Sequence, residues 1–220
     1  MTIQWDLDIL APGGLSVDLA GTAIEAPRAS SGLTGAIDFS GGGFWTVELR
    51  KIGVIERSSH LLYQRYRNHL NGGVRTILVP ILNDFAAAQP DGMRAILGGV
   101  AESAAIGTVA ADAALAAGTI AITLPSGGVL VGGETFSIQH PTKDWHAYSI
   151  GDIDSVTTTS EVSTYTVGIR PPLREAVTAG AVANFYRPLC LMRLRPGTTM
   201  PWEPEDWWNF RPTVQLVEKL

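Results

Sequence analysis

Residues 169–177 read Ile-Arg-Pro-Pro-Leu-Arg-Glu-Ala-Val, and residues 188–194 read Pro-Leu-Cys-Leu-Met-Arg-Leu. The pattern predicts an apolar strand, a charged turn and a second apolar strand that closes a small β-unit. Proline fixes its own φ and has no N–H for a sheet, so Pro171-Pro172 marks the end of the first strand. Arg170, Arg174 and Glu175 are interpreted as the charged rim of this unit. The stretch therefore predicts packed strands rather than an active site.

The composition predicts one large β-domain or two small ones with a core of their own. Of the 220 residues, 45% are hydrophobic and 17% are charged, below the roughly 25% of typical domains. Low surface charge favours an obligate oligomer, whose interfaces resemble a domain core. A monomer rich in alanine and glycine is the alternative. The net charge is −5 and no basic run occurs, so we expect no direct nucleic-acid recognition.

Cysteine usage and apolar runs exclude several other classes. Cys190 is the only cysteine, so no intrachain disulfide can form, and its apolar neighbours predict a small buried side chain. The first residues lack the basic start and apolar run of a signal peptide. The most apolar region, residues 95–124, is interrupted by Glu102 and Asp112. We therefore expect no membrane span.

Residues 1–85, with residues 200–220 returning to them, predict a β-sandwich or split-barrel domain that carries one helix. Alternation of apolar and polar residues is the main signal, because it places one face of each strand on a core. The first two strands are expected to pair with each other. Strands are expected at residues 3–9, 15–19, 36–39, 44–50, 74–80 and 211–220.

The helix is expected from about residue 58 to residue 70. Leu62, Tyr66 and Leu70 are four residues apart and form one apolar stripe. Ser58 or Ser59 is the expected N-cap, and residues 71–73, Asn-Gly-Gly, predict a left-handed C-cap. Because a buried strand follows directly, the helix is expected to cover the sheet of its own domain.

Residues 86–108 are expected to form a linker or extended loop, and residues 109–195 a small OB-like β-barrel. The barrel is predicted from short strands that are separated by glycine-rich turns. These strands are expected at residues 119–124, 129–131, 135–138, 147–150, 165–169 and 189–194.

Candidate chemical sites are few. His140, Asp144 and His146 are the best metal candidates, since a hairpin could bring them together. A polar turn is favoured, because a metal site needs three or four ligands with supporting hydrogen bonds. Cys190 could pair with either histidine as a nucleophile, but an apolar strand raises a thiol pKa and lowers its reactivity. We expect no metal, no cofactor and no catalytic residue.

Glycines and carboxylates do not change this expectation. Residues 41–43, Gly-Gly-Gly, precede a strand, whereas a phosphate-binding loop precedes a helix. A hairpin turn or bulge is therefore predicted there. Carboxylate pairs such as Asp152 and Asp154 are typical of solvated strand edges rather than of a glycosidase.

Aromatic residues supply the candidate contact sites. Trp202, Trp207, Trp208 and Phe210 lie close together in the C-terminal segment, and tryptophan is enriched at interface hot spots. These four residues are predicted to line an oligomer interface. Trp145 and Tyr148 are predicted as candidate contacts for a receptor or glycan.

Two regions resemble a known family, the distal tail and minor tail-tip proteins of siphophages, the long-tailed bacteriophages. The first joins Phe44-Trp45-Thr46-Val47-Glu48-Leu49 to the helix and to the segment from Asn71-Gly72-Gly73 to Pro80. The second is similar to the β-module appended in these proteins. It covers residues 117–122, Leu130, Gly133, Phe136, Ile138, residues 169–174 and residues 190–194.

The resemblance implies a virion protein of the tail tip, made in the host cytoplasm. It implies a ring, usually hexameric, that joins the tail tube to the hub and contacts other tail-tip proteins. The second module would face outward and could contact a host surface glycan. Rings arise when head-to-tail contacts between copies close.

Three functional hypotheses remain open. The first is a structural ring protein of the baseplate or tail tip, which is not an enzyme. The second is a carbohydrate- or receptor-binding β-module that acts in host adsorption. The third is a wall-degrading hydrolase, which loss of activity in Asp152→Asn or Cys190→Ala would support.

Overall fold

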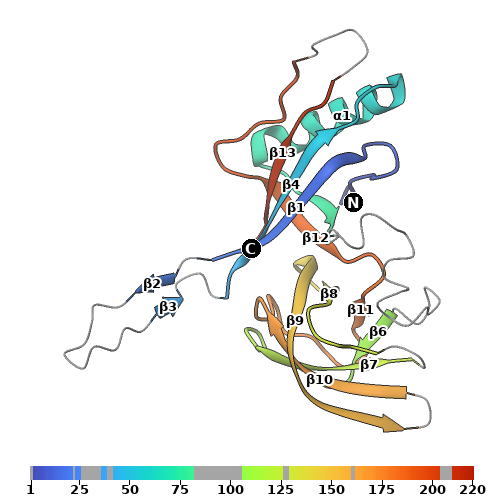
Figure 1. Ribbon diagram of the computed structural model, residues 1–220, viewed down its shortest axis with the longest axis vertical. Helices are drawn as coiled ribbons and strands as arrows, with labels where there is room; N and C mark the ends of the chain where they lie inside the picture. The colour runs from blue at the N-terminus through green and yellow to red at the C-terminus, as the bar shows by residue number, and fades with distance from the viewer. Residues whose placement is uncertain are drawn as a thin grey trace.

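The computed structural model describes residues 2–21, 23–25, 36–38, 42–81, 106–125, 129–159, 162–203 and 210–220. Within these residues the protein has a curled five-stranded sheet with one helix, a closed six-stranded barrel and a separate two-stranded sheet (Figure 1). We call these the sheet unit, the barrel and the arm. The expected mainly β fold, with one helix-bearing unit and a second small barrel, is confirmed. No helix in the described ranges is long and apolar enough to cross a membrane.

The sheet unit is antiparallel, with strand order β1-β4-β13-β12-β5. The alternation in residues 211–220 predicted a C-terminal strand in this unit, and that strand lies between β4 and β12. Side chains on one face of each strand share a core with the helix. The strands are β1 (Pro12–Ala20), β4 (Phe44–Ile52), β5 (Ile77–Pro80), β12 (Leu189–Leu194) and β13 (Val214–Glu218).

The single helix, α1 (Arg57–Leu70), covers this sheet, and the expected apolar stripe explains why. Tyr66 and Leu70 are buried in the core of the sheet unit together with Tyr63, whereas Leu62 is only partly buried. The predicted C-cap is confirmed, because Asn71 has left-handed angles of φ 43° and ψ 56°. The N-cap prediction was wrong: Glu56 is the N-cap, and its backbone N–H donates to Ser59 Oγ at 3.0 Å.

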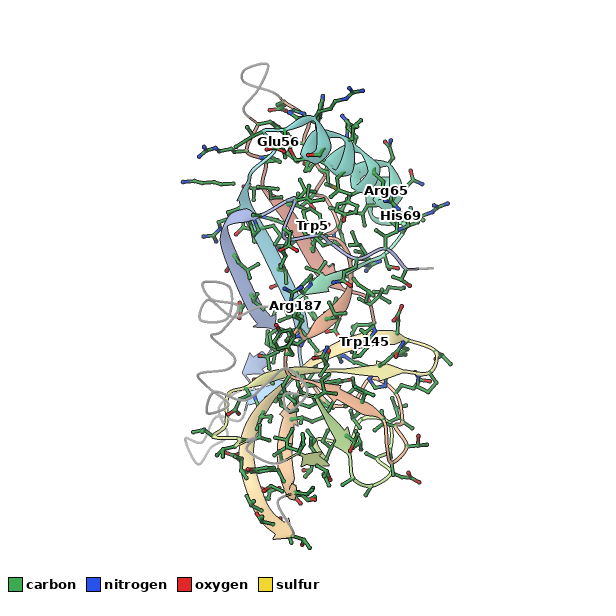
Figure 2. The ribbon with its side chains drawn as sticks, turned by 90° about the vertical axis from the view of Figure 1, so that its right-hand side faces the viewer. Trp5, Glu56, Arg65, His69, Trp145 and Arg187 are labelled. Carbon is green, nitrogen blue, oxygen red and sulfur yellow. The ribbon has the colours of Figure 1, made fainter. Side chains whose placement is uncertain are left out.

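The predicted strand at residues 3–9 is also wrong. Only Gln4 forms a bridge, parallel to Leu78, and residues 7–9 form a turn. The Trp5 N–H donates to the Leu78 carbonyl at 2.7 Å, and the Trp5 ring lies beneath α1, 5.1 Å from Tyr66 (Figure 2). This segment therefore caps the β5 edge, while β1 pairs with β4 instead.

The barrel closes in the order β10-β7-β6-β11-β8-β9 around a second core. Most of its predicted strands are present, but Val129–Val131 is not a strand. Residues 86–105 of the predicted linker lie outside the described residues, and its last residues already belong to β6. The barrel strands are β6 (Ile106–Val109), β7 (Thr119–Leu124), β8 (Thr135–His140), β9 (Asp144–Thr159), β10 (Val162–Arg170) and β11 (Val182–Asn184).

Strand β12 is the main correction to the predicted topology. It was expected to close the barrel, but it pairs with β5 and β13 in the sheet unit. Cys190, Met192 and Leu194 are buried in the core shared with α1. Alternation shows that one face of a strand is buried but not which sheet buries it.

Candidate functional site: a buried polar joint between sheet and barrel

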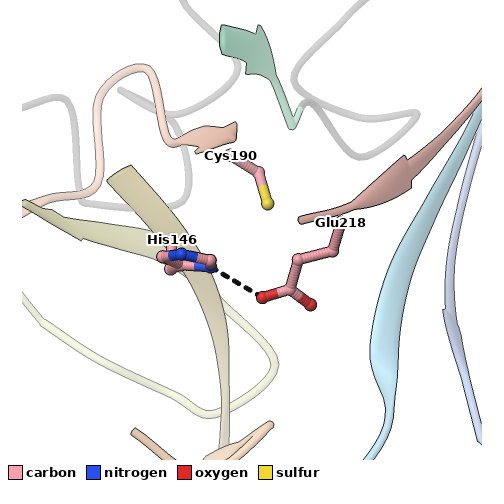
Figure 3. A group of neighbouring side chains, drawn as sticks. All are labelled: His146, Cys190 and Glu218. Atoms are coloured by element: carbon pink, nitrogen blue, oxygen red, sulfur yellow. Dashed lines mark hydrogen bonds and ion pairs between the residues drawn. The ribbon is translucent and has the colours of Figure 1, made fainter. Parts of the chain in front are cut away.

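The sheet unit meets the barrel where β12 packs against β9. Three buried side chains from different strands lie together here: His146 from β9, Cys190 from β12 and Glu218 from β13 (Figure 3). One nitrogen, sulfur or oxygen atom of each lies within 4.8 Å of those of the others. Among the residues that the structure describes, no other group of histidine, cysteine and carboxylate side chains is gathered in this way.

Glu218 is the centre of this joint, although it is 2% exposed. Its Oε1 accepts hydrogen bonds from His146 Nδ1 at 2.8 Å and Arg174 Nε at 2.9 Å. Its Oε2 accepts from Arg174 Nη2 at 2.9 Å and from the Trp45 N–H at 3.0 Å. A carboxylate has about four acceptor positions, so this one is fully satisfied.

The pKa of Glu218 reflects two opposing effects. Burial raises it, because a charged carboxylate loses its water, but the hydrogen bonds from His146 and Arg174 outweigh that effect. The net pKa is below the usual value for glutamate. Glu218 is therefore a buried carboxylate held in its ionised form.

Arg174 connects the barrel to β13 and to the segment that precedes β4. Besides its two bonds to Glu218, its Nη2 donates to the Gly43 carbonyl at 2.6 Å. Its backbone N–H donates to the Tyr148 hydroxyl at 3.1 Å. The prediction of a charged rim was wrong for Arg174, because its side chain is only 10% exposed. Only tertiary packing supplies its partner, which lies 44 residues away in the sequence.

The other two rim residues behave differently. Arg170 is exposed at the end of β10. Glu175 accepts hydrogen bonds from the Thr142 N–H at 3.1 Å, the Thr142 hydroxyl at 2.9 Å and the Lys143 N–H at 3.2 Å. Glu175 thus holds the turn between β8 and β9.

Two further contacts close the joint. Trp45 Nε1 donates to the Ala147 carbonyl of β9 at 2.7 Å. Gly42, with φ +90°, lies so close to Pro172 that a Cβ there would be 2.1 Å from the proline Cδ. Gly42 and Gly43 directly precede β4, so this segment faces the double proline rather than a phosphate. The double proline therefore also packs against the sheet unit.

The geometry suits a structural joint better than a reactive centre. The four acceptor positions of Glu218 are used, so a metal ion would have to displace Arg174 or His146. Burial raises the pKa of the Cys190 thiol well above its usual value, which keeps it protonated. The order Cys190–His146–Glu218 resembles a catalytic triad, but all three side chains are buried.

The three predicted metal candidates do not gather at one point. The rings of His140 and His146 lie 5.7 Å apart, but His146 is bonded to Glu218 and Asp144 is bonded elsewhere. His140 Nε2 is bonded to the Tyr148 hydroxyl at 2.6 Å, and burial lowers the pKa of His140 to about 4. The carboxylate of Asp144 accepts from the Thr2 hydroxyl at 2.7 Å and from the Trp145 N–H at 3.1 Å. Residues 141–143 form a turn, which was the favoured alternative.

The predicted contact aromatics have mixed positions. Trp202 is half-buried and packs on Tyr63 and Phe210, with ring centroids 6.1 Å and 5.3 Å away. Phe210 is 4% exposed, so it belongs to the core of its own chain. Trp207 and Trp208 lie outside the described residues.

Of the two candidate glycan contacts, only one is accessible. Tyr148 is fully buried, which excludes it as a stacking surface in this conformation. Trp145 is half-exposed at the start of β9, at the level where the two units meet (Figure 2).

Glu218 was missed as a site residue by the sequence reasoning. A signal was present, because Val214, Leu216 and Glu218 share one face of a strand whose apolar members are buried. A carboxylate on a buried face requires a charged or hydrogen-bonding partner. That partner could not be named from the sequence. No family model matches the chain, and no curated protein is significantly similar to it.

Proposed function

We propose that this chain is a structural protein of a siphophage tail tip, a distal tail protein. In this proposal it is a virion component and not an enzyme. It forms a ring, hexameric as the resemblance implies, that joins the tail tube to the hub and the adsorption apparatus. Its partners are further copies of itself, the tail tube protein and other tail-tip proteins.

The arm is the observation that carries this proposal. Strands β2 (Ala23–Glu25) and β3 (Ala36–Asp38) pair with each other and, within the part of the chain that the structure describes, with no other strand. Figure 1 shows them extending away from the ends of β1 and β4. A two-stranded ribbon is marginally stable by itself in water, so a projecting one is suited to a contact with another chain.

The joint supports the same proposal. Its buried hydrogen bonds hold the barrel in one orientation on the sheet unit, through strands that are distant in the sequence. A protein that spaces other components in an assembly needs such fixed geometry. Exposed ion pairs, which are weak, would hold the two units less firmly.

Light scattering coupled to size-exclusion chromatography, followed by negative-stain electron microscopy, tests the proposal. We expect a single multimeric species that forms closed rings with rotational symmetry. A chain that stays monomeric at every concentration tested, and does not bind tail tube protein, would contradict a ring-forming tail component.

A second candidate function is glycan binding by the barrel during host adsorption. The half-exposed ring of Trp145 favours it, because sugars stack on accessible aromatic rings and the neighbouring Gln139 is exposed. A glycan array with the wild-type protein and Trp145→Ala tests this function. Equal binding by both proteins, or none by either, would remove Trp145 as the contact.

A further inference from the structure

The outer edge of β1 can be read from the hydrogen-bond direction of its neighbour β4. The Trp45 N–H donates to Glu218 on β13, so odd-numbered residues of β4 direct their amides toward β13. Backbone groups of successive strand residues point to opposite sides. The even-numbered residues of β4 from Phe44 to Arg50 therefore face β1.

This alternation assigns the backbone groups of β1. Ser16 is opposite Glu48 and Asp18 is opposite Thr46, so these two residues bond to β4. The Thr46 hydroxyl also donates to the Asp18 carbonyl at 3.3 Å, in agreement with a carbonyl that faces β4. The N–H and C=O groups of the residues between and beside them point away from the sheet.

Leu15, Val17 and Leu19 are the residues whose backbone groups point outward. They lie opposite residues of β4 without exchanging backbone hydrogen bonds, and no described strand pairs with the outer side of β1. Their side chains pack against the core of the sheet unit but are only partly buried. Adding a strand beyond β1 would cover them further.

Strand β1 also lacks the features that usually protect an edge strand. It is nine residues long, contains no lysine, has one charged residue (Asp18), and its only proline (Pro12) stands at its first position. Long edges without charge or proline pair readily with another chain. This edge is therefore available for the addition of a strand.

We propose that the arm of a second copy of this chain pairs with the outer edge of β1 and extends the five-stranded sheet. The inference rests on the proposed function, since it names the contact between neighbouring copies. Each strand of the arm has one edge paired with its partner, and no described residue pairs with its other edge, which we assign to a new partner. Pairing would stabilise both surfaces. The two-stranded ribbon would gain a third strand, and the unpaired backbone groups at the β1 edge would gain hydrogen bonds.

The occupant is a neighbouring copy rather than the same chain. The arm leaves the sheet at the end of β1 and continues away from it (Figure 1). Because the arm and the β1 edge are different surfaces, the contact is heterologous. Repeated contacts of this kind close into a ring when the rotation between copies allows it.

Two variants test the two sides of the contact separately, one at the β1 edge and one at the arm. Val17→Pro removes an outward N–H without removing a hydrogen bond to β4, and Val17→Ala is its control, because it also shortens the side chain but keeps the N–H. In the second variant, a short glycine–serine turn replaces residues 23–38. Circular dichroism first shows whether each variant keeps the wild-type fold.

We expect the wild type and Val17→Ala to form the same multimer by light scattering. Val17→Pro and the armless chain should each be folded monomers. When the two monomers are mixed, they should form a one-to-one heterodimer, because one retains the arm and the other retains the free edge.

Three results would overturn the inference, and they differ in what they say of the proposed function. A multimer that survives in Val17→Pro or in the armless chain means that the ring uses other surfaces, so the proposed function stands. Monomers that fail to combine on mixing also exclude an arm-to-edge contact. A wild type that is monomeric throughout contradicts both the inference and the proposed ring.

Discussion

Arg174→Met should destabilise the protein far more than the loss of an ordinary surface ion pair. The substitution removes two of the four hydrogen bonds to Glu218 and the bond to the Gly43 carbonyl. It leaves a carboxylate that is 2% exposed without its cationic partner. Removing one member of a buried pair costs about 3–5 kcal/mol, because the remaining charge is uncompensated. We expect a loss of unfolding free energy in this range.

Arg50→Met is the matched control. Arg50 donates to Glu48 through Nε at 2.8 Å and Nη2 at 2.6 Å, so it makes the same type of contact. Its side chain is 55% exposed and that of Glu48 is 29% exposed. Exposed pairs contribute about 0.2–1 kcal/mol, so the same substitution should have a small effect here.

Urea denaturation followed by far-ultraviolet circular dichroism, at one protein concentration, measures both effects. If Arg174→Met does not fold, Glu218→Gln gives a milder test, because it removes the charge and retains one acceptor. With Arg174→Met/Glu218→Gln the measurements form a double-mutant cycle, in which we expect a coupling above about 1 kcal/mol. If Arg174→Met loses no more stability than Arg50→Met, or the cycle is additive, the joint does not stabilise the protein as argued.

Three further predictions concern the same region. First, the unfolding free energy should fall as the pH drops from about 6.5 toward 4. Burial lowers the pKa of His140 to about 4 in the folded protein, whereas the unfolded chain binds that proton near pH 6.5. His140→Gln should flatten this dependence in urea titrations at pH 7 and pH 4.5, and an unchanged slope would exclude His140 as its source. Second, Gly42→Ala should lower the melting temperature more than Gly72→Ala, since both have positive φ but only Gly42 has a neighbour where a Cβ would lie; equal melting temperatures would contradict the Pro172 contact. Third, Cys190 should react with a thiol reagent such as dithionitrobenzoate only after urea unfolding, because it is fully buried with a raised pKa; fast reaction of the native protein would show that the joint opens.

Local signals in the sequence were sufficient for several elements. Helix α1 has its apolar stripe and its left-handed stop within a single segment, so its length and C-cap were predictable. The alternation in β4 and β13 likewise predicted strands with one buried face. The N-cap is Glu56 and not Ser58 or Ser59, because the Ser59 hydroxyl accepts a hydrogen bond from the Glu56 N–H. This difference is a detail of local geometry.

Partners across the fold were not predictable in the same way. Strand β12 has the same alternation whether it completes the barrel or the sheet unit, and only packing assigned it to the sheet unit. Arg174 was interpreted as exposed, because charged residues in a turn normally are. Its partner, Glu218, lies in a different strand, so the pattern around Arg174 does not indicate it.

The sequence by itself determined that this is a mainly β protein with one helix, a single buried cysteine and low charge. These properties follow from the pattern and type of neighbouring residues, which act over a few positions. Tertiary structure alone decided that His146, Arg174 and Glu218 meet, that the double proline packs on Gly42, and that no described strand pairs with the outer side of β1. Hydrogen bonds between strands and between buried charges join residues that are far apart in the chain, so no local pattern specifies them.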